Sequence, residues 1–133
     1  MTPINTSEFS LDKFDKLLIQ VIDEVLRYTL GDLNTSIIYE YLERRYCPLN
    51  DIPNNLEAFS MELKNLLGCG RGQILGSAHI LEKAILKVLC ARLGLKFDFD
   101  GPIAFADCIR KLKEMYSNEK VTLFKQYSVK NWR

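Results

Sequence analysis

Apolar residues recur at alternating three- and four-residue spacings along most of the chain, which is the pattern of amphipathic helices. The first such segment covers about residues 11–30, with Ser10 as its expected N-cap and Gly31 as its expected end. Its predicted buried stripe consists of Leu11, Phe14, Leu18, Val21, Val25 and Tyr28. A second helix is expected over Asn34 to Tyr46, capped by Asn34, and its predicted buried face consists of Ile37, Ile38, Tyr41 and Leu42.

A loop at residues 47–55 separates these helices from a third one. Pro48 and Pro53 limit the freedom of this loop, and Leu49 and Ile52 are expected to tuck beneath it. The third helix runs from a cap at Asn54 or Asn55 to Leu67, with Gly68 at its end, and its apolar residues are Leu56, Phe59, Leu63, Leu66 and Leu67.

The most apolar long segment, at about residues 73–93, is the predicted central helix. Its apolar positions cover about half of the helix circumference, which indicates packing against several partner helices. They are Ile74, Leu75, Ala78, Leu81, Ile85, Val88, Leu89 and Leu93. Gly94 is expected to end this helix in the left-handed conformation that glycine adopts easily.

A fifth helix is predicted from Pro102 onward, with a stripe of Phe105, Ile109, Leu112 and Tyr116. The tail at residues 118–133 fits both a short helix and an extended strand, and we favour a helical turn. The pattern as a whole predicts an all-α fold, a single compact bundle of five to six helices in one domain over residues 1–133.

Composition supports one globular domain, since 47% of the 133 residues are hydrophobic and 26% are charged. We find no apolar run of the roughly 18 residues that would cross a membrane, and no signal peptide, so a cytoplasmic protein is expected. The net charge of +1 hides an asymmetry, because residues 1–66 carry six Lys/Arg against eleven Asp/Glu and residues 67–133 carry twelve against six. Complementary patches for self-association, a basic face for an anionic partner and a merely dipolar surface all fit this asymmetry.

Cysteine and histidine offer little chemistry. The four cysteines, Cys47, Cys69, Cys90 and Cys108, match no zinc or redox spacing and are expected to be buried thiols. His79 is the only histidine, so it cannot build a metal site or a catalytic triad alone. We therefore expect no metal, no cofactor and no catalytic residues.

Three closely spaced glycines precede the central helix and invite comparison with phosphate-binding loops. Backbone amides of Gly68, Gly70 and Gly72, together with Arg71, are candidates for holding an anion. Against this, a helix rather than a strand precedes them, and Gln73 stands where a dinucleotide fingerprint needs its third glycine. A tight structural turn between helices is the favoured interpretation.

Glu82 is the candidate buried polar residue, because it lies within the apolar sector of the central helix. A buried carboxylate needs partners, and the expected ones are backbone amides or an arginine such as Arg27 or Arg71. The alternative role, a general base with a raised pKa, also requires a pocket.

The C-terminal segment from Arg110 mixes cations with aromatic rings, a composition suited to docking the tail on its own core, to contact with another protein, or to stacking on bases between phosphate contacts. Its candidate contact residues are Arg110, Lys111, Lys113, Phe124, Lys125, Tyr127, Lys130, Trp132 and Arg133. Docking or protein contact is favoured over nucleic-acid binding, because no recognised nucleic-acid motif accompanies the charge.

Several residues between about 14 and 96 resemble the nitrosopumilus output domain family of small archaeal helical domains. They are Tyr39, Tyr41, Leu42, Tyr46, Ile52, Pro53, Phe59, Leu63, Leu67, Gly68, Gly70, Leu81, Glu82, Ile85, Leu86, Leu89, Leu93 and Gly94. The resemblance implies a noncatalytic all-helical module that relays signals or binds partners. Residues 98–133 lie outside it and form a basic-aromatic extension.

The sequence thus favours a noncatalytic interaction or regulatory module, with a homodimer as one form of the interaction. Nucleic-acid binding through the basic C-terminal segment is the alternative function, and an enzyme ranks last.

Overall fold

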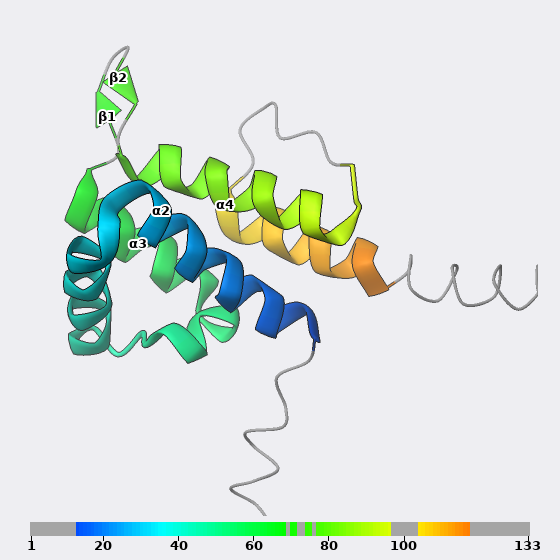
Figure 1. Ribbon diagram of the computed structural model, residues 1–133, viewed down its shortest axis with the longest axis horizontal. Coiled ribbons are helices and arrows are strands. Elements are labelled where there is room, and N and C mark those ends of the chain that lie inside the picture. The colour runs from blue at the N-terminus through cyan, green and yellow to red at the C-terminus, as the bar shows by residue number, and fades with distance from the viewer. Residues whose placement is uncertain (1–12, 69, 72–73, 76, 97–103, 118–133) are drawn as a thin grey trace, which may run out of the picture.

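The computed structural model describes residues 13–68, 70–71, 74–75, 77–96 and 104–117, and within these residues the chain forms an all-α bundle, as predicted (Figure 1). Its elements are α2 (Lys13–Arg44), the 3-10 helix η1 (Leu49–Asn54), α3 (Leu56–Leu67), strands β1 (Gly70–Arg71) and β2 (Ile74–Leu75), and α4 (Ser77–Leu93). One more helix covers residues 105–117 and is called here the 105–117 helix.

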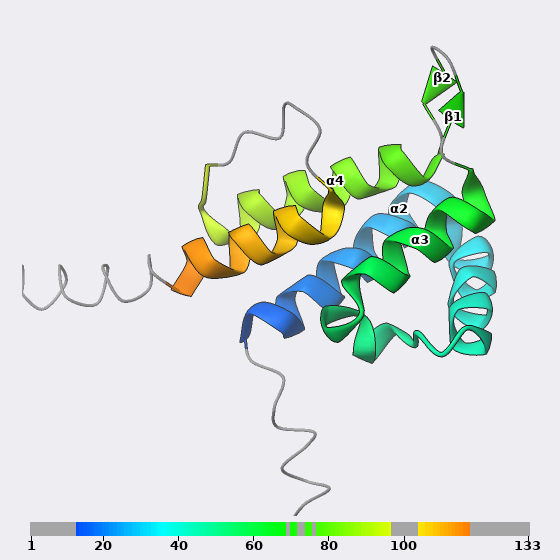
Figure 2. The ribbon, with the colours of Figure 1, turned by 180° about the vertical axis from the view of Figure 1, so that it is seen from behind.

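The helices bury most of the described residues of the apolar stripes that the sequence predicts. Side chains that are almost fully buried come from every helix of the bundle: Phe14, Leu18, Ile22, Leu26, Leu42, Ile52, Phe59, Leu63, Ile85, Leu89, Ile109 and Leu112. The 105–117 helix lies alongside α4 in both views (Figures 1 and 2). It is joined to α3 by the Phe59–Phe105 ring contact and to α2 by Phe14–Tyr116. Residues distant in sequence thus pack together in a single hydrophobic core.

The two helices predicted over residues 11–46 meet at Gly31 and are described together as α2. Gly31 breaks its geometry with φ 88° and ψ 164°, but the helix resumes at once, without a linker. The prediction that Asn34 caps a new helix is wrong, because its amide donates to the carbonyl of Leu30, at the end of the first half. The second half, residues 32–44, turns away from the first half, residues 13–30, and stands at one end of the bundle (Figure 2).

α4 begins at Ser77, later than the predicted central helix at about residue 73. Ile74 and Leu75 belong instead to β2, where they pair antiparallel with Arg71 and Gly70 of β1. A strand pairing this short depends on the turn joining the strands, and periodicity alone does not distinguish it from the first turn of a helix.

Two helices end in the same backbone arrangement, the Schellman motif. At the end of α2, the Cys47 amide donates to the Leu42 carbonyl and the Tyr46 amide to the Glu43 carbonyl. At the end of α4, the Leu95 amide donates to the Cys90 carbonyl and the Gly94 amide to the Ala91 carbonyl. The left-handed residue is the predicted Gly94 in one case, with φ 69°, and Tyr46 in the other, with φ 63°. Pro48 therefore follows the end of α2 rather than causing it.

Within the described ranges, none of the helices has the length and apolar character needed to span a membrane.

Candidate protein-interaction surface

The second half of α2 carries an exposed stripe that combines apolar and acidic side chains. Leu33 is 76% exposed and Ile37 is 50% exposed. Together with Ser36, Tyr39, Glu40 and Glu43 they line a shallow surface groove of about 430 Å³. We call Leu33, Ser36, Ile37, Glu40 and Glu43 the α2 stripe. Their spacing of three and four residues places them along one side of the helix.

This surface contradicts two predictions. Ile37 was expected in the buried face, but the residues of this half that are buried are Thr35, Ile38 and Leu42. Tyr28 was expected in the buried stripe of the first half, but it is 92% exposed. Both residues lie near the bend at Gly31, and three- and four-residue spacing alone assigns them to the wrong side of their helices.

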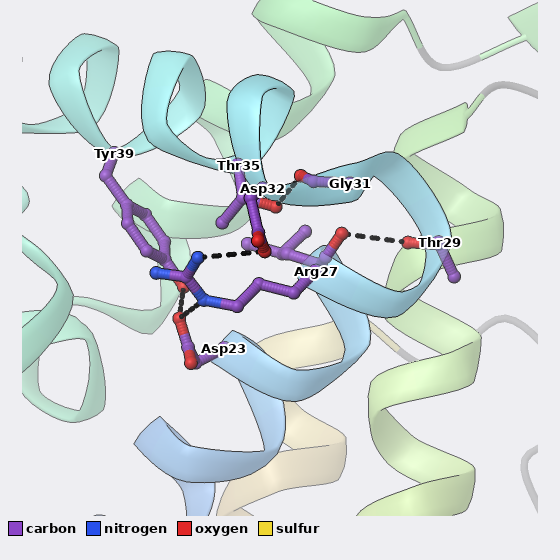
Figure 3. A network of polar contacts seen from close by, with 8 residues as sticks. Asp23, Arg27, Thr29, Gly31, Asp32, Thr35 and Tyr39 are labelled. Atoms are coloured by element: carbon purple, nitrogen blue, oxygen red, sulfur yellow. Dashed lines mark hydrogen bonds and ion pairs between the residues drawn. The ribbon is translucent and has the colours of Figure 1, made fainter.

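The orientation of the α2 stripe depends on the backbone at Gly31, where hydroxyl groups satisfy nearby carbonyls. Thr35 donates its hydroxyl to the Gly31 carbonyl at 2.7 Å, and Thr29 donates to the Val25 carbonyl at 2.6 Å (Figure 3). At φ 88° and ψ 164°, Gly31 has a conformation that is essentially restricted to glycine. The position of the bend is therefore determined by this residue.

A polar network spans the bend and connects the two halves of α2 (Figure 3). Asp23 accepts from the Arg27 guanidinium at 2.9 Å and from the Tyr39 hydroxyl at 2.6 Å, and Arg27 also donates to Asp32 at 3.1 Å. Burial raises the pKa of Tyr39 far above its ordinary value, and the hydrogen bond to Asp23 raises it further. Tyr39 also lines the groove, so its hydrogen bond to Asp23 connects the groove at the α2 stripe to this network.

The other end of the second half is tied to α3. The Tyr41 hydroxyl donates to Glu62 at 3.0 Å, and the Arg45 guanidinium lies 3.7 Å from the same carboxylate and 5.3 Å from the centre of the Tyr41 ring. Cation–π stacking and a shared carboxylate hold this end in place. The helix that carries the α2 stripe is thus anchored at both ends.

Glu82 is buried, as the sequence predicts, with 5% of its surface exposed. Its partner is different from those expected, because the Ser60 hydroxyl of α3 donates to its carboxylate, and Lys64 donates to Ser60 at 3.2 Å. The serine links α3 to α4 through the buried carboxylate. Glu82 lines neither the groove at the α2 stripe nor the cavity at Asp15 described below.

The glycine turn is only partly within the described residues. Gly68 ends α3 with φ 87°, while Gly70 and Arg71 form β1, and Gly72 lies outside the described residues. The turn is therefore a small hairpin between helices, and the tight helix-to-helix turn that we expected is corrected to this extent.

The described cations of the C-terminal segment are largely engaged with carboxylates. Arg110 binds Glu57 of α3 and lies 3.1 Å from Asp107, and Lys113 donates to Asp15 at 3.1 Å. Lys111 is exposed. The remaining candidates, Phe124, Lys125, Tyr127, Lys130, Trp132 and Arg133, lie outside the described residues.

A cavity of about 300 Å³ lies where α2, η1, α3 and the 105–117 helix meet. Its wall combines apolar side chains with the Asp15–Lys113 pair, and its lining residues are Phe14, Asp15, Leu18, Pro53, Asn54, Leu56, Ile109, Arg110 and Lys113. The charged side chains that line it form ion pairs, Asp15 with Lys113 and Arg110 with Glu57. The cavity therefore does not favour an anionic or a cationic ligand.

Three thiols are buried, as expected for Cys47, Cys90 and Cys108, and Cys69 lies outside the described residues. Burial raises the pKa of all three, which keeps them protonated and poorly nucleophilic. His79 is exposed on α4. In the described part of the chain, no group of three or more His, Cys, Asp or Glu side chains is placed to hold a metal ion.

Sequence reasoning missed the α2 stripe as a site. The available signal was Gly31, which predicts the end of the first helix and therefore also a place where the next helix can take a new direction.

No family model, curated protein or solved structure matches the chain. The resemblance to the nitrosopumilus output domain family stays a prediction.

Proposed function

We propose that the protein is a noncatalytic helical interaction module that binds another protein through the α2 stripe. The observation that supports this most is the exposure of Leu33 and Ile37 next to each other on a helix that is anchored at both ends. Adjacent exposed apolar side chains are typical of interaction sites, whereas isolated ones are common on any surface. An anchored helix also loses little conformational entropy on binding.

The resemblance to the output domain family supports the same role, because that family is expected to be noncatalytic and to relay signals. An archaeal origin, a cytoplasmic location and self-association as a homodimer belong to this proposal in the same way. None of them is required for the α2 stripe to bind a partner.

Nucleic-acid binding through the basic C-terminal residues has weaker support. Arg110 and Lys113 already have carboxylate partners, so binding phosphates would require these ion pairs to break. Titration with single-stranded DNA at several salt concentrations tests it. Salt-sensitive affinity that depends on residues 118–133 and not on the α2 stripe would favour it over protein binding.

Site-specific photo-crosslinking in cells tests the proposed function. A photoreactive amino acid at Ser36, in the middle of the α2 stripe, is expected to give adducts of defined mass with another protein chain. The matched control carries the same group at Lys87, which is exposed on α4. Adducts at Ser36 should disappear when Ile37→Asp is added and persist when Ile80→Asp is added, because Ile80 has similar exposure, 55%, on another helix. Identical adducts from Ser36 and Lys87 would contradict the proposal.

A further inference from the structure

We infer that the partner of the α2 stripe is a cationic amphipathic helix on another protein. This inference rests on the proposed function and adds the chemistry of the partner. It starts from the order of residues along the stripe, in which apolar Leu33 and Ile37 come first and the carboxylates of Glu40 and Glu43 follow.

The shape of the stripe fits a helix. Leu33 to Glu43 extends for about 15 Å at the rise of an α-helix, which a partner helix of about three turns would cover. Ser36 lies between the two apolar residues, and its small side chain lets a partner backbone approach the groove. The two large aliphatic side chains supply a ridge for packing between the side chains of a partner helix, the helix-in-groove mode of recognition.

The charge of the stripe selects a basic partner. Glu43 forms no ion pair within the described ranges, and Glu40 has one, with Arg44 at 3.6 Å. Both side chains of that pair are mostly exposed, 72% and 66%, so little free energy is lost when Arg44 gives way to a partner's lysine. A second copy of the same face would bring carboxylates together, so charge disfavours a symmetric dimer through the stripe.

The test uses the full chain and three labelled 14-residue peptides, titrated by fluorescence anisotropy. The first peptide has leucines at alternating three- and four-residue spacing and lysines elsewhere, the second has glutamate in place of every lysine, and the third has the composition of the first in an order without an apolar face. We expect the first peptide to bind at least about tenfold more tightly than the other two.

Variants locate the binding. Reversing two charges with Glu40→Lys and Glu43→Lys should weaken the lysine peptide by about tenfold or more and strengthen the glutamate peptide. Glu114→Lys, on the exposed side of the 105–117 helix, is the matched control and should have little effect. Ile37→Asp should abolish binding, whereas Ile80→Asp should not.

Equal binding of the lysine and glutamate peptides, or no effect of the double charge reversal, would overturn the inference. Light scattering that shows a dimer lost in Ile37→Asp would overturn it as well. Neither result removes the proposed function, which fails if the crosslinks at Ser36 do not depend on Ile37 or if Ser36 and Lys87 give identical adducts.

Discussion

The two halves of α2 follow each other across the bend at Gly31 but differ in what they bury. The first half, residues 13–30, contributes Phe14, Leu18, Ile22 and Leu26 to the centre of the core, all at most 2% exposed. The second half buries Ile38 and Leu42 and leaves Leu33 and Ile37 exposed. Similar amphipathic patterns thus give a core helix in the first half and a helix with an exposed apolar stripe in the second. Burial depends on which other helices surround the segment and not on its own periodicity.

The largest expected effect comes from making the same substitution in both halves. Ile22→Ala, in the first half, should lower the free energy of unfolding by about 2–5 kcal/mol, because it removes buried methyl groups and leaves a cavity. Ile37→Ala, in the second half, should change it by less than about 0.5 kcal/mol, as expected at the surface. Urea denaturation followed by circular dichroism measures both. Similar losses for the two variants would show that Ile37 contributes to the core.

The next largest effect on the free energy of unfolding is expected from a substitution at Gly31, where the two halves meet. Gly31→Ala meets no steric contact, since nothing lies within 4 Å of an added Cβ, but its backbone conformation is unfavourable for alanine. We therefore expect a loss of about 1–3 kcal/mol in the free energy of unfolding. A gain in stability, as alanine gives inside a straight helix, would contradict the bend at this position.

The network across the bend should have a smaller effect, with a dependence on pH. Tyr39→Phe removes the hydrogen bond to Asp23 and should cost about 0.5–1.5 kcal/mol at neutral pH. The pKa of Tyr39 is raised in the folded protein, so the folded state retains a proton that the unfolded state loses above about pH 10. Stability should therefore fall as the pH rises beyond that point, and less steeply in Tyr39→Phe than in the wild type.

Tyr28→Phe is the control for this measurement, because Tyr28 is 92% exposed. Its unfolding free energy should follow that of the wild type over the same pH range. An unchanged slope in Tyr39→Phe would show that the hydroxyl of Tyr39 does not tie the two halves together.

The smallest expected effect is a gain at the end of the second half. Tyr46 holds φ 63° where α4 has Gly94, and a non-glycine residue in this conformation costs about 1–2 kcal/mol. Tyr46→Gly removes that strain but increases the backbone entropy of the unfolded chain, which leaves a net gain of roughly 0.5–1 kcal/mol. Thermal unfolding should show a higher midpoint, and Gly94→Ala should show a lower one. A lower midpoint for Tyr46→Gly would mean that the tyrosine ring makes stabilising contacts.

Much of the fold follows from local patterns. The apolar stripes of α3 and the 105–117 helix predict Phe59, Leu63, Ile109 and Leu112 as core residues, and each is at most 1% exposed. Gly94 predicts the end of α4, because a single residue with φ above zero is a local requirement that glycine meets at the least cost. Burial of Glu82 also follows from its place on the helix wheel.

The candidate site could not be predicted in the same way. Periodicity places Ile37 and Ile38 on one apolar face, yet Ile38 is 3% exposed and Ile37 is 50% exposed. The partner of Glu82 is Ser60, 22 residues earlier on another helix, and no local pattern connects the two. The sequence alone determined the approximate positions of α2, α3, α4 and the 105–117 helix, since these depend on spacing and end signals within a few residues. Only the tertiary structure decided which apolar side chains stay at the surface, because burial depends on which side of the second half of α2 the other helices pack against, and that side carries Ile38 and Leu42 and not Leu33 and Ile37.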